Sequence, residues 1–199
     1  MNMTAKVLRN KHVAAWRATH GPLRRANLGA QVRVYGRMEV TLATGSSISV
    51  GRRTVFNSVP SLNTLMAHGP NILRTLTPQA EIEIGEFCGF TSATVSAAVR
   101  VTIGPRSLIG PNTLITDSDH HPVDLGPVPR RFRGFPASDS SDAISVGEDV
   151  FIGARTIILK GVTIGAGSVV GAGSVVTRSI PEGVIAAGNP CRVVREVKS

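Results

Sequence analysis

The chain has 199 residues, of which 42% are hydrophobic but only 4% aromatic, and its formal net charge is +9. This length suffices for one domain with its own core, and the shortage of aromatics means that small branched side chains must fill that core, which favours strands and turns over helix bundles. The charge favours polyanionic partners. Because zinc-finger spacing and RNP-type aromatic motifs are both lacking, the sequence argues against nucleic acid as that partner.

The N-terminal segment, residues 1–30, is basic and is expected to cap the domain. Lysines and arginines surround apolar residues between Lys6 and Arg25. This pattern predicts a short helix packed on the domain, or an amphipathic helix lying on a membrane surface, and we prefer the first. No apolar run reaches the roughly 20 residues of a membrane helix, and no secretory signal is present. We therefore expect a cytoplasmic protein.

Aliphatic residues recur with a period of six through much of the chain. This period matches neither a helix nor a simple alternation, so no helix can place all of these residues on one face. It fits a solenoid in which each flat side takes six residues, with the aliphatic side chain inside and glycine at the turns. We therefore expect an all-β solenoid over residues 31–187, with parallel strands about 4.8 Å apart. The series comprises Ile84, Ile103, Ile109, Ile115, Val146, Ile152, Ile158, Ile164, Val170 and Val176.

Two segments interrupt this repeat. The interval from Ile115 to Val146 is not a multiple of six and is dense in proline, glycine, arginine and serine, which predicts an extruded loop over residues 117–145. Residues 56–79 interrupt the repeat earlier, and they either shape an acceptor pocket or connect coils. Residues 188–199 are predicted to form a turn and a short basic helix that closes the open end of the solenoid.

The dense hexads of residues 152–196, IGARTIILKGVTIGAGSVVGAGSVVTRSIPEGVIAAGNPCRVVRE, resemble those of the hexapeptide-repeat acyltransferases. The resemblance implies a left-handed parallel β-helix, and it is closest to the O-acetyltransferases of sugars, including the galactoside, maltose and exopolysaccharide enzymes. It covers residues 80–195 well. It further implies acetyl-CoA as the acyl donor, a sugar or glycan-precursor acceptor, and a homotrimer with each active site between two subunits.

The stretch ITDSDHHPVD, residues 115–124, stands where the repeat gives way to the predicted loop. A sugar hydroxyl is hardly ionised at neutral pH, so acyl transfer to it requires a base, and histidine is the natural one. The His-Pro motif of the resembling transferases implies His121, whereas the galactoside and maltose spacing leaves His120 open. Because neither Cys88 nor Cys191 lies near this stretch in the repeat, direct attack is preferred over a covalent enzyme intermediate.

Two aspartates of this stretch are further candidates. One interpretation is that Asp119 or Asp117 orients the imidazole and stabilises its protonated form. The other is that each aspartate only fixes the turn by hydrogen bonding. A metal site is the rival interpretation, since γ-class carbonic anhydrases share the implied fold and bind a metal through three histidines. Adjacent histidines in an extended backbone point to opposite faces, so His120 and His121 would not readily bind one ion, and we expect no metal.

The basic C-terminal part suits coenzyme A, which carries several phosphates. The galactoside enzymes have a cofactor-binding segment, and the resemblance implies that the six matching residues of this chain bind coenzyme A. Ala154 departs from the serine that often stands there, and Arg178 replaces the usual lysine while keeping its charge. The six residues are Ala154, Ala172, Thr177, Arg178, Arg192 and Arg195.

The acceptor side departs from the galactoside and maltose pattern. The acceptor-binding asparagine and aspartate of those enzymes align with Phe90 and Ala98, and the local stretch offers Ser92 and Ser96 instead. We therefore expect an acetyl-CoA-dependent O-acetyltransferase in surface-polysaccharide or lipopolysaccharide synthesis, at the inner face of the membrane if the acceptor is lipid-linked. The alternatives are an N-acetyltransferase of an amino-sugar nucleotide and, more distantly, a metal enzyme like the γ-carbonic anhydrases.

Overall fold

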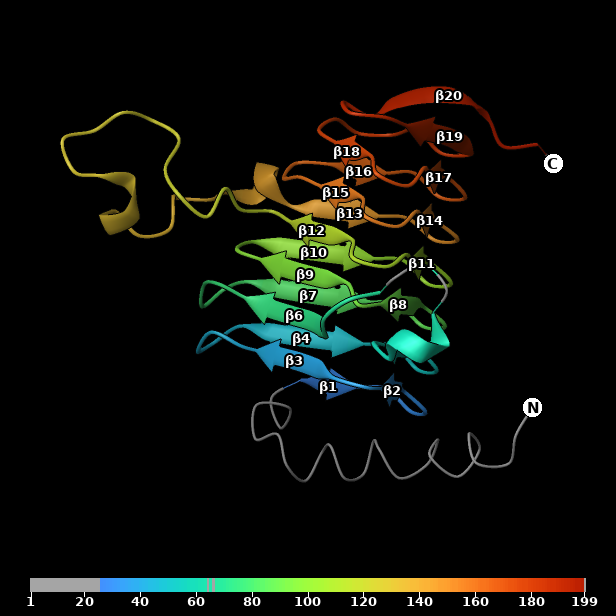
Figure 1. Ribbon diagram of the computed structural model, residues 1–199. Coiled ribbons are helices and arrows are strands. Elements are labelled where there is room, and N and C mark those ends of the chain that lie inside the picture. The colour runs from blue at the N-terminus through green and yellow to red at the C-terminus, as the bar shows by residue number, and fades with distance from the viewer. Residues whose placement is uncertain (1–25, 64, 66, 199) are drawn as a thin grey trace.

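The computed structural model describes residues 26–63, 65 and 67–198, and this part is built almost entirely of short parallel strands stacked in three sheets (Figure 1). The predicted capping or amphipathic helix of the N-terminal segment falls in residues 1–25 and lies outside the described residues. Among the described residues, no helix has the length and apolar character needed to cross a membrane.

Each of the first six coils contributes one strand to each sheet, and the C-terminal residues add two more strands to the second sheet; we name the sheets A, B and C in the order in which the chain visits them. Sheet A contains β1 (Asn27–Leu28), β4 (Ser47–Val50), β7 (Glu81–Ile84), β10 (Arg100–Ile103), β13 (Ile144–Val146) and β16 (Thr163–Ile164). Sheet B contains β2 (Arg33–Tyr35), β5 (Val55–Asn57), β8 (Gly89–Thr91), β11 (Leu108–Ile109), β14 (Phe151–Ile152), β17 (Val169–Val170), β19 (Val184–Ala187) and β20 (Arg192–Glu196). Sheet C contains β3 (Met38–Thr41), β6 (Asn71–Thr75), β9 (Thr94–Ala97), β12 (Leu114–Thr116), β15 (Ile157–Ile158) and β18 (Val175–Val176).

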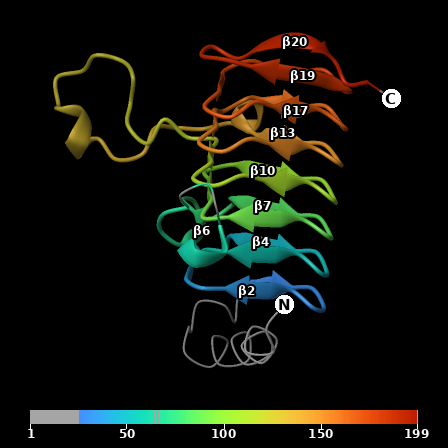
Figure 2. The ribbon, with the colours of Figure 1, turned by 45° about the vertical axis from the view of Figure 1, so that its right-hand side comes forward.

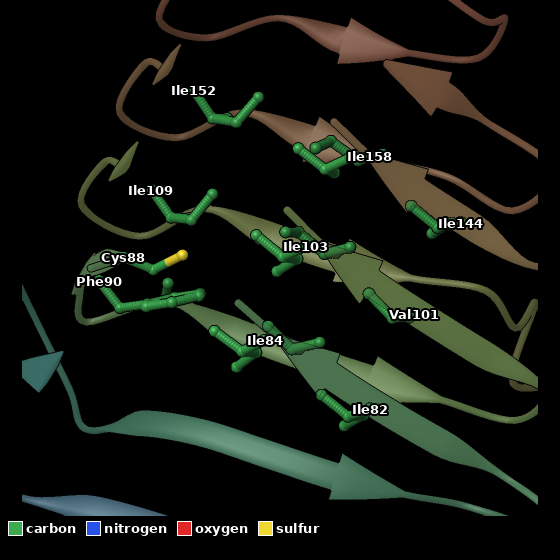
Figure 3. Close-up of a cluster of buried hydrophobic side chains, with 14 of the residues drawn as sticks. Ile82, Ile84, Cys88, Phe90, Val101, Ile103, Ile109, Ile144, Ile152 and Ile158 are labelled. Atoms are coloured by element: carbon green, nitrogen blue, oxygen red, sulfur yellow. The ribbon is translucent and has the colours of Figure 1, made fainter. Parts of the chain in front are cut away.

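The repeating aliphatic residues point into the prism and form its core. In sheet A, Ile84, Ile103 and Val146 are neighbours on successive strands, and each is at most 4% exposed. Figure 3 shows such inward-pointing side chains stacked from coil to coil. Burial of one such branched side chain contributes about 1.5–3 kcal/mol, so a column of small residues stabilises the fold without many aromatics. The predicted all-β solenoid is confirmed.

Close approach of successive coils explains the glycines at the corner between sheets A and B. A Cβ atom added at Gly104 would lie 2.5 Å from the carbonyl carbon of Gly147 in the next coil. No side chain fits in that space. At this corner the hexad glycine is therefore required for the stacking of coils.

The extruded loop leaves the prism between β12 and β13, as predicted, and extends well away from the stack (Figures 1 and 2). It contains two short 3-10 helices, η3 (Arg130–Phe132) and η4 (Ser140–Asp142). The earlier interruption is shorter than the predicted residues 56–79, since β5 runs to Asn57 and β6 begins at Asn71. A single 3-10 turn, η2 (Pro60–Leu62), lies within it.

The predicted C-terminal helix within residues 188–199 is wrong. Residues Arg192–Glu196 form β20, which pairs antiparallel with β19 and extends sheet B (Figure 1). The β-branched Val193 and Val194 favour a strand, and an added strand satisfies the backbone groups that β19 would otherwise leave at the edge. The end of the solenoid is thus closed by strand addition.

Candidate active site

The two adjacent histidines lie at the corner between sheets C and A, where the chain leaves β12 for the extruded loop. The carboxylate of the fully buried Asp117 anchors this departure. It accepts hydrogen bonds from the backbone N–H groups of Ala98, Val99 (2.9 Å) and Arg100 (2.8 Å) in the preceding coil. Burial raises the pKa of Asp117, and the three donors oppose this shift. This arrangement supports the turn-fixing alternative for Asp117.

His120 is half-buried and is engaged by its neighbours. Its backbone lies in the left-handed region, with φ of 58°, and its N–H donates to Ser118 Oγ at 3.1 Å. Its Nε2 lies 3.3 Å from Thr116 Oγ1, and its ring is 6.1 Å from that of Phe135 in the loop. The prediction of an extended backbone at the histidine pair is therefore wrong, because His120 has a left-handed backbone. The two rings are not related as neighbouring side chains of a strand are.

His121 is exposed, and its imidazole makes no hydrogen bond or ion pair within the described part of the chain. Its backbone N–H donates to the carbonyl oxygen of Asp119 at 2.7 Å, and the following Pro122 is buried. The residue is thus held by its backbone while its ring stays available. Of the two histidines, His121 is thus the one whose ring is exposed and makes no such contact in the described part of the chain.

The Asp119 carboxylate points to a lysine rather than to an imidazole. Its Oδ2 lies 2.8 Å from Nζ of Lys160, which also lies 3.2 Å from Oδ1 of Asp142. Hydrogen bonds to these two carboxylates raise the pKa of Lys160. The direct contact between Asp119 and a histidine ring that the sequence suggested is not present in this structure.

Sequence reasoning missed Lys160. The pairing of Ile115 with Ile158 places Lys160 one coil beyond Asp117, since each residue follows its paired isoleucine by two positions. The hexad register alone could therefore have placed Lys160 next to the histidine stretch. This was not apparent because the extruded loop separates Asp117 and Lys160 widely in sequence.

The six predicted cofactor residues fall into three places. Thr177 and Arg178 follow β18 at the corner of the histidines, two strand spacings from β12, or about 10 Å along the axis. Ala154 and Ala172 lie at the corner between sheets B and C in successive coils, where the Gly173 N–H donates to the Ala154 carbonyl oxygen at 2.8 Å.

The remaining two, Arg192 and Arg195, are exposed on β20. Their guanidinium groups donate to backbone carbonyl oxygens, those of Cys191 at 2.8 Å and Glu196 at 3.0 Å. Thus only Thr177 and Arg178 share a corner with the histidines within one chain. Among the described residues, no three His, Cys, Asp or Glu side chains gather in a way that would hold a metal ion.

The acceptor candidates differ in their relation to this corner. Ser96 pairs in register with Thr116, the residue that contacts the His120 ring, and its buried hydroxyl has no partner among the described residues. Ser92 instead donates to the Gly69 carbonyl oxygen at 3.0 Å and fixes a turn. Ser96 is therefore the serine that lies beside the histidines.

An open hollow of 390 Å³ lies away from the histidines, over sheet B and its corner with sheet C. Its lining includes Val55, Leu108 and Phe151 of sheet B, and Asn63 and Leu65 of the earlier interruption. This segment therefore shapes a surface hollow as well as connecting coils.

Similarity to known proteins agrees with this architecture. Residues 143–178 match the family described as the hexapeptide repeat of succinyl-transferase. The galactoside O-acetyltransferase of Escherichia coli (strain K12) is 41% identical over 119 residues, which are 59% of this chain and 55% of that protein. That of Lactococcus lactis subsp. lactis is 41% identical over 99 residues, 49% of this chain and 44% of that protein. The chain thus carries this hexapeptide repeat and is similar to these acetyltransferases over about half of its length.

A solved galactoside acetyltransferase in complex with coenzyme A superposes with a TM-score of 0.58 and 27% identity, covering 95% of this chain and 73% of that one. The left-handed parallel β-helix implied by the hexads is confirmed. The chain spans about half the length of the curated relatives that it matches.

Proposed function

We propose that this protein is a hexapeptide-repeat, acetyl-CoA-dependent O-acetyltransferase that acts on a sugar hydroxyl, with His121 as the general base. The observation that carries the proposal is the exposed, unengaged imidazole of His121 on a stretch that Asp117 anchors to the preceding coil. The galactoside acetyltransferase that shares the fold is a complex with coenzyme A, which supports a CoA thioester as the donor.

The reaction requires little beyond a base and donors for an oxyanion. The His121 imidazole takes the proton of the acceptor hydroxyl as its oxygen attacks the thioester carbonyl carbon. Backbone N–H groups stabilise the resulting tetrahedral oxyanion. The intermediate collapses with cleavage of the carbon–sulfur bond, and the imidazolium returns the proton to the leaving thiolate. The products are an acetyl ester and the free thiol of CoA.

The environment of His120 makes it the weaker candidate base. Its ring nitrogen faces the Thr116 hydroxyl and its ring lies beside Phe135, so it is less available to an acceptor than the ring of His121. In this proposal Asp117 and Asp119 act on the backbone of the histidine stretch and touch no reacting atom.

We further propose that the active enzyme is a homotrimer with a site shared by two subunits. The predicted cofactor residues lie at two different corners of the prism, Thr177 and Arg178 at one and Ala154 and Ala172 at the other. A neighbouring subunit that apposes these corners would unite them around one cofactor. Light scattering of the purified protein should then give three times the monomer mass, and a monomer would contradict the shared site.

The proposed acceptor is a precursor of a surface polysaccharide or lipopolysaccharide. A lipid-linked precursor would place the enzyme at the cytoplasmic face of the membrane, where the basic segment of residues 1–30 favours peripheral association. Co-sedimentation with anionic vesicles, compared with neutral ones, tests the association.

The enzymatic test uses purified protein, acetyl-CoA and a panel of sugar, glycan-precursor and amino-sugar nucleotide acceptors. Release of CoA thiol with a hydroxyl acceptor, and an acetyl product that hydroxylamine cleaves, supports O-acetylation. A hydroxylamine-resistant product from an amine acceptor would replace it with N-acetylation. Activity lost on chelation and restored by zinc would favour the metal enzyme. The absence of transfer to every acceptor would contradict the proposal.

A further inference from the structure

Lys160 joins both ends of the extruded loop to one point of the prism. It follows β15, one coil beyond the histidines, and its ammonium group contacts Asp119 (2.8 Å) and Asp142 (3.2 Å). Asp119 lies just after β12, where the loop leaves, and Asp142 lies in η4, just before the loop returns to β13. One side chain thus connects two segments that a long excursion separates in sequence.

The returning end of the loop has supports other than Lys160. The Gly161 N–H donates to the Asp142 carbonyl oxygen at 2.7 Å. The Asp139 carboxylate accepts from the Ser141 N–H at 2.7 Å, and the second oxygen of the Asp142 carboxylate accepts from the Asp139 N–H at 3.3 Å, which together form a capping box around η4. This end stays fixed if the ammonium group is removed.

At the leaving end, Asp117 holds the chain from below, but the Asp119 side chain depends on Lys160 directly. Within the described part of the chain, Lys160 is the one partner of the Asp119 carboxylate. The Asp119 carbonyl oxygen in turn accepts the His121 N–H at 2.7 Å. A continuous series of contacts therefore runs from the rigid returning end through Lys160 and Asp119 to the candidate base.

We propose that Lys160 is a positioning residue for His121, which holds the histidine stretch through Asp119 without touching a reacting atom. This inference rests on the proposed function. It also accounts for the direction of the Asp119 carboxylate, which neutralises a lysine and leaves the imidazole unpaired. Removal of the ammonium group would leave the Asp119 and Asp142 carboxylates repelling each other at the root of the loop.

A second cation in the prism provides a matched control. Arg106 contacts Glu148 at 3.0 Å and Asp149 at 2.7 Å, and its side chain is 49% exposed, compared with 42% for Lys160. It lies between β10 and β11, at the corner between sheets A and B, away from the loop. Exposed ion pairs of this kind contribute about 0–1 kcal/mol to stability, so neither cation is required for folding.

The experiment compares Lys160→Met, Lys160→Arg and Arg106→Met. Displacement of a catalytic group by about an ångström can cost on the order of 100-fold in rate, so a partial loosening in Lys160→Met is expected to lower kcat about tenfold while leaving the KM for acetyl-CoA within about twofold. Lys160→Arg keeps the charge and should recover most of kcat. Arg106→Met should keep the wild-type kcat at a similar melting temperature.

Hydrogen exchange provides a readout that does not depend on catalysis. Amides in the peptide of residues 115–124 should exchange faster in Lys160→Met than in wild type, with no change in Arg106→Met. Wild-type exchange and wild-type kcat in Lys160→Met would overturn the inference, as would an equal loss of kcat in Arg106→Met. If the wild-type protein transfers acetyl to no acceptor, the proposed function fails, and the exchange comparison alone decides whether Lys160 holds the histidine stretch.

Discussion

Two corners of the prism carry opposite kinds of sequence. The corner between sheets A and B repeats with little change, with Gly85, Gly104 and Gly147 in contact from coil to coil and exposed ion pairs between neighbouring turns. The corner between sheets C and A instead carries a buried aspartate, two histidines, a bridging lysine and the extruded loop. The residues of the first corner serve the stacking of coils. The second corner interrupts the regular repeat, and the candidate catalytic residues lie at this interruption.

The largest expected effect comes from breaking the anchor of the irregular corner. Asp117→Ala removes the acceptor of three backbone N–H groups, at a cost of about 3 kcal/mol in the free energy of unfolding. Because these bonds also hold the histidine stretch, kcat should fall by at least about tenfold at temperatures where the protein stays folded. Urea unfolding and steady-state kinetics measure the two effects.

Asp124→Ala is the control for this substitution. Asp124 is an exposed aspartate of the same loop, paired with Arg133, and its loss should cost less than about 1 kcal/mol. Equal losses in the two variants would show that Asp117 is no special anchor.

The next effect tests the regular corner. Gly104→Ala places a Cβ atom 2.5 Å from backbone of the next coil, and the shift needed to admit it should cost about 2 kcal/mol. Gly167→Ala is the comparison, because a Cβ atom there meets no heavy atom within 4 Å and only the positive φ of 65° opposes it, at about 1 kcal/mol. A smaller loss for Gly104→Ala than for Gly167→Ala would contradict the requirement for close stacking.

A smaller effect is expected for Arg178, which shares the corner with the histidines and Lys160. If Arg178 binds a CoA phosphate, Arg178→Met should raise the KM for acetyl-CoA about tenfold, which corresponds to about 1.4 kcal/mol, with kcat nearly unchanged. Arg37→Met, at an exposed arginine between β2 and β3, should leave both constants unaltered. An unchanged KM in Arg178→Met would remove Arg178 from the cofactor site.

The smallest effect distinguishes the two histidines. Thr116→Val removes the hydroxyl beside His120 Nε2, and kcat should change by less than about threefold if His120 is not the base. A loss of kcat near that of a histidine deletion would transfer the role of base to His120.

The regular parts of the fold could be predicted from sequence, and the irregular parts only incompletely. Ile103, Ile109 and Ile158 follow one rule, that of a branched side chain facing inward every six residues, and the structure buries all three. The strand Arg192–Glu196 follows no such rule, because its partner β19 is fixed only once the solenoid has ended.

The candidate site shows the same division. His121 could be named as a candidate because it belongs to a local motif, whereas the contact of Lys160 with Asp119 depends on how a long loop returns to the prism. The contact of the His120 ring with Phe135 of the loop likewise lies outside the local pattern. The local pattern therefore named the candidate residues, and the contacts of the loop set their geometry.

The comparison of His121→Ala with His120→Ala tests the central claim most directly. With acetyl-CoA and an acceptor that the wild-type protein uses, His121→Ala should lower kcat at least about 100-fold, whereas His120→Ala should lower it by less than about tenfold, with both variants folded by circular dichroism. Wild-type turnover in His121→Ala would contradict the account.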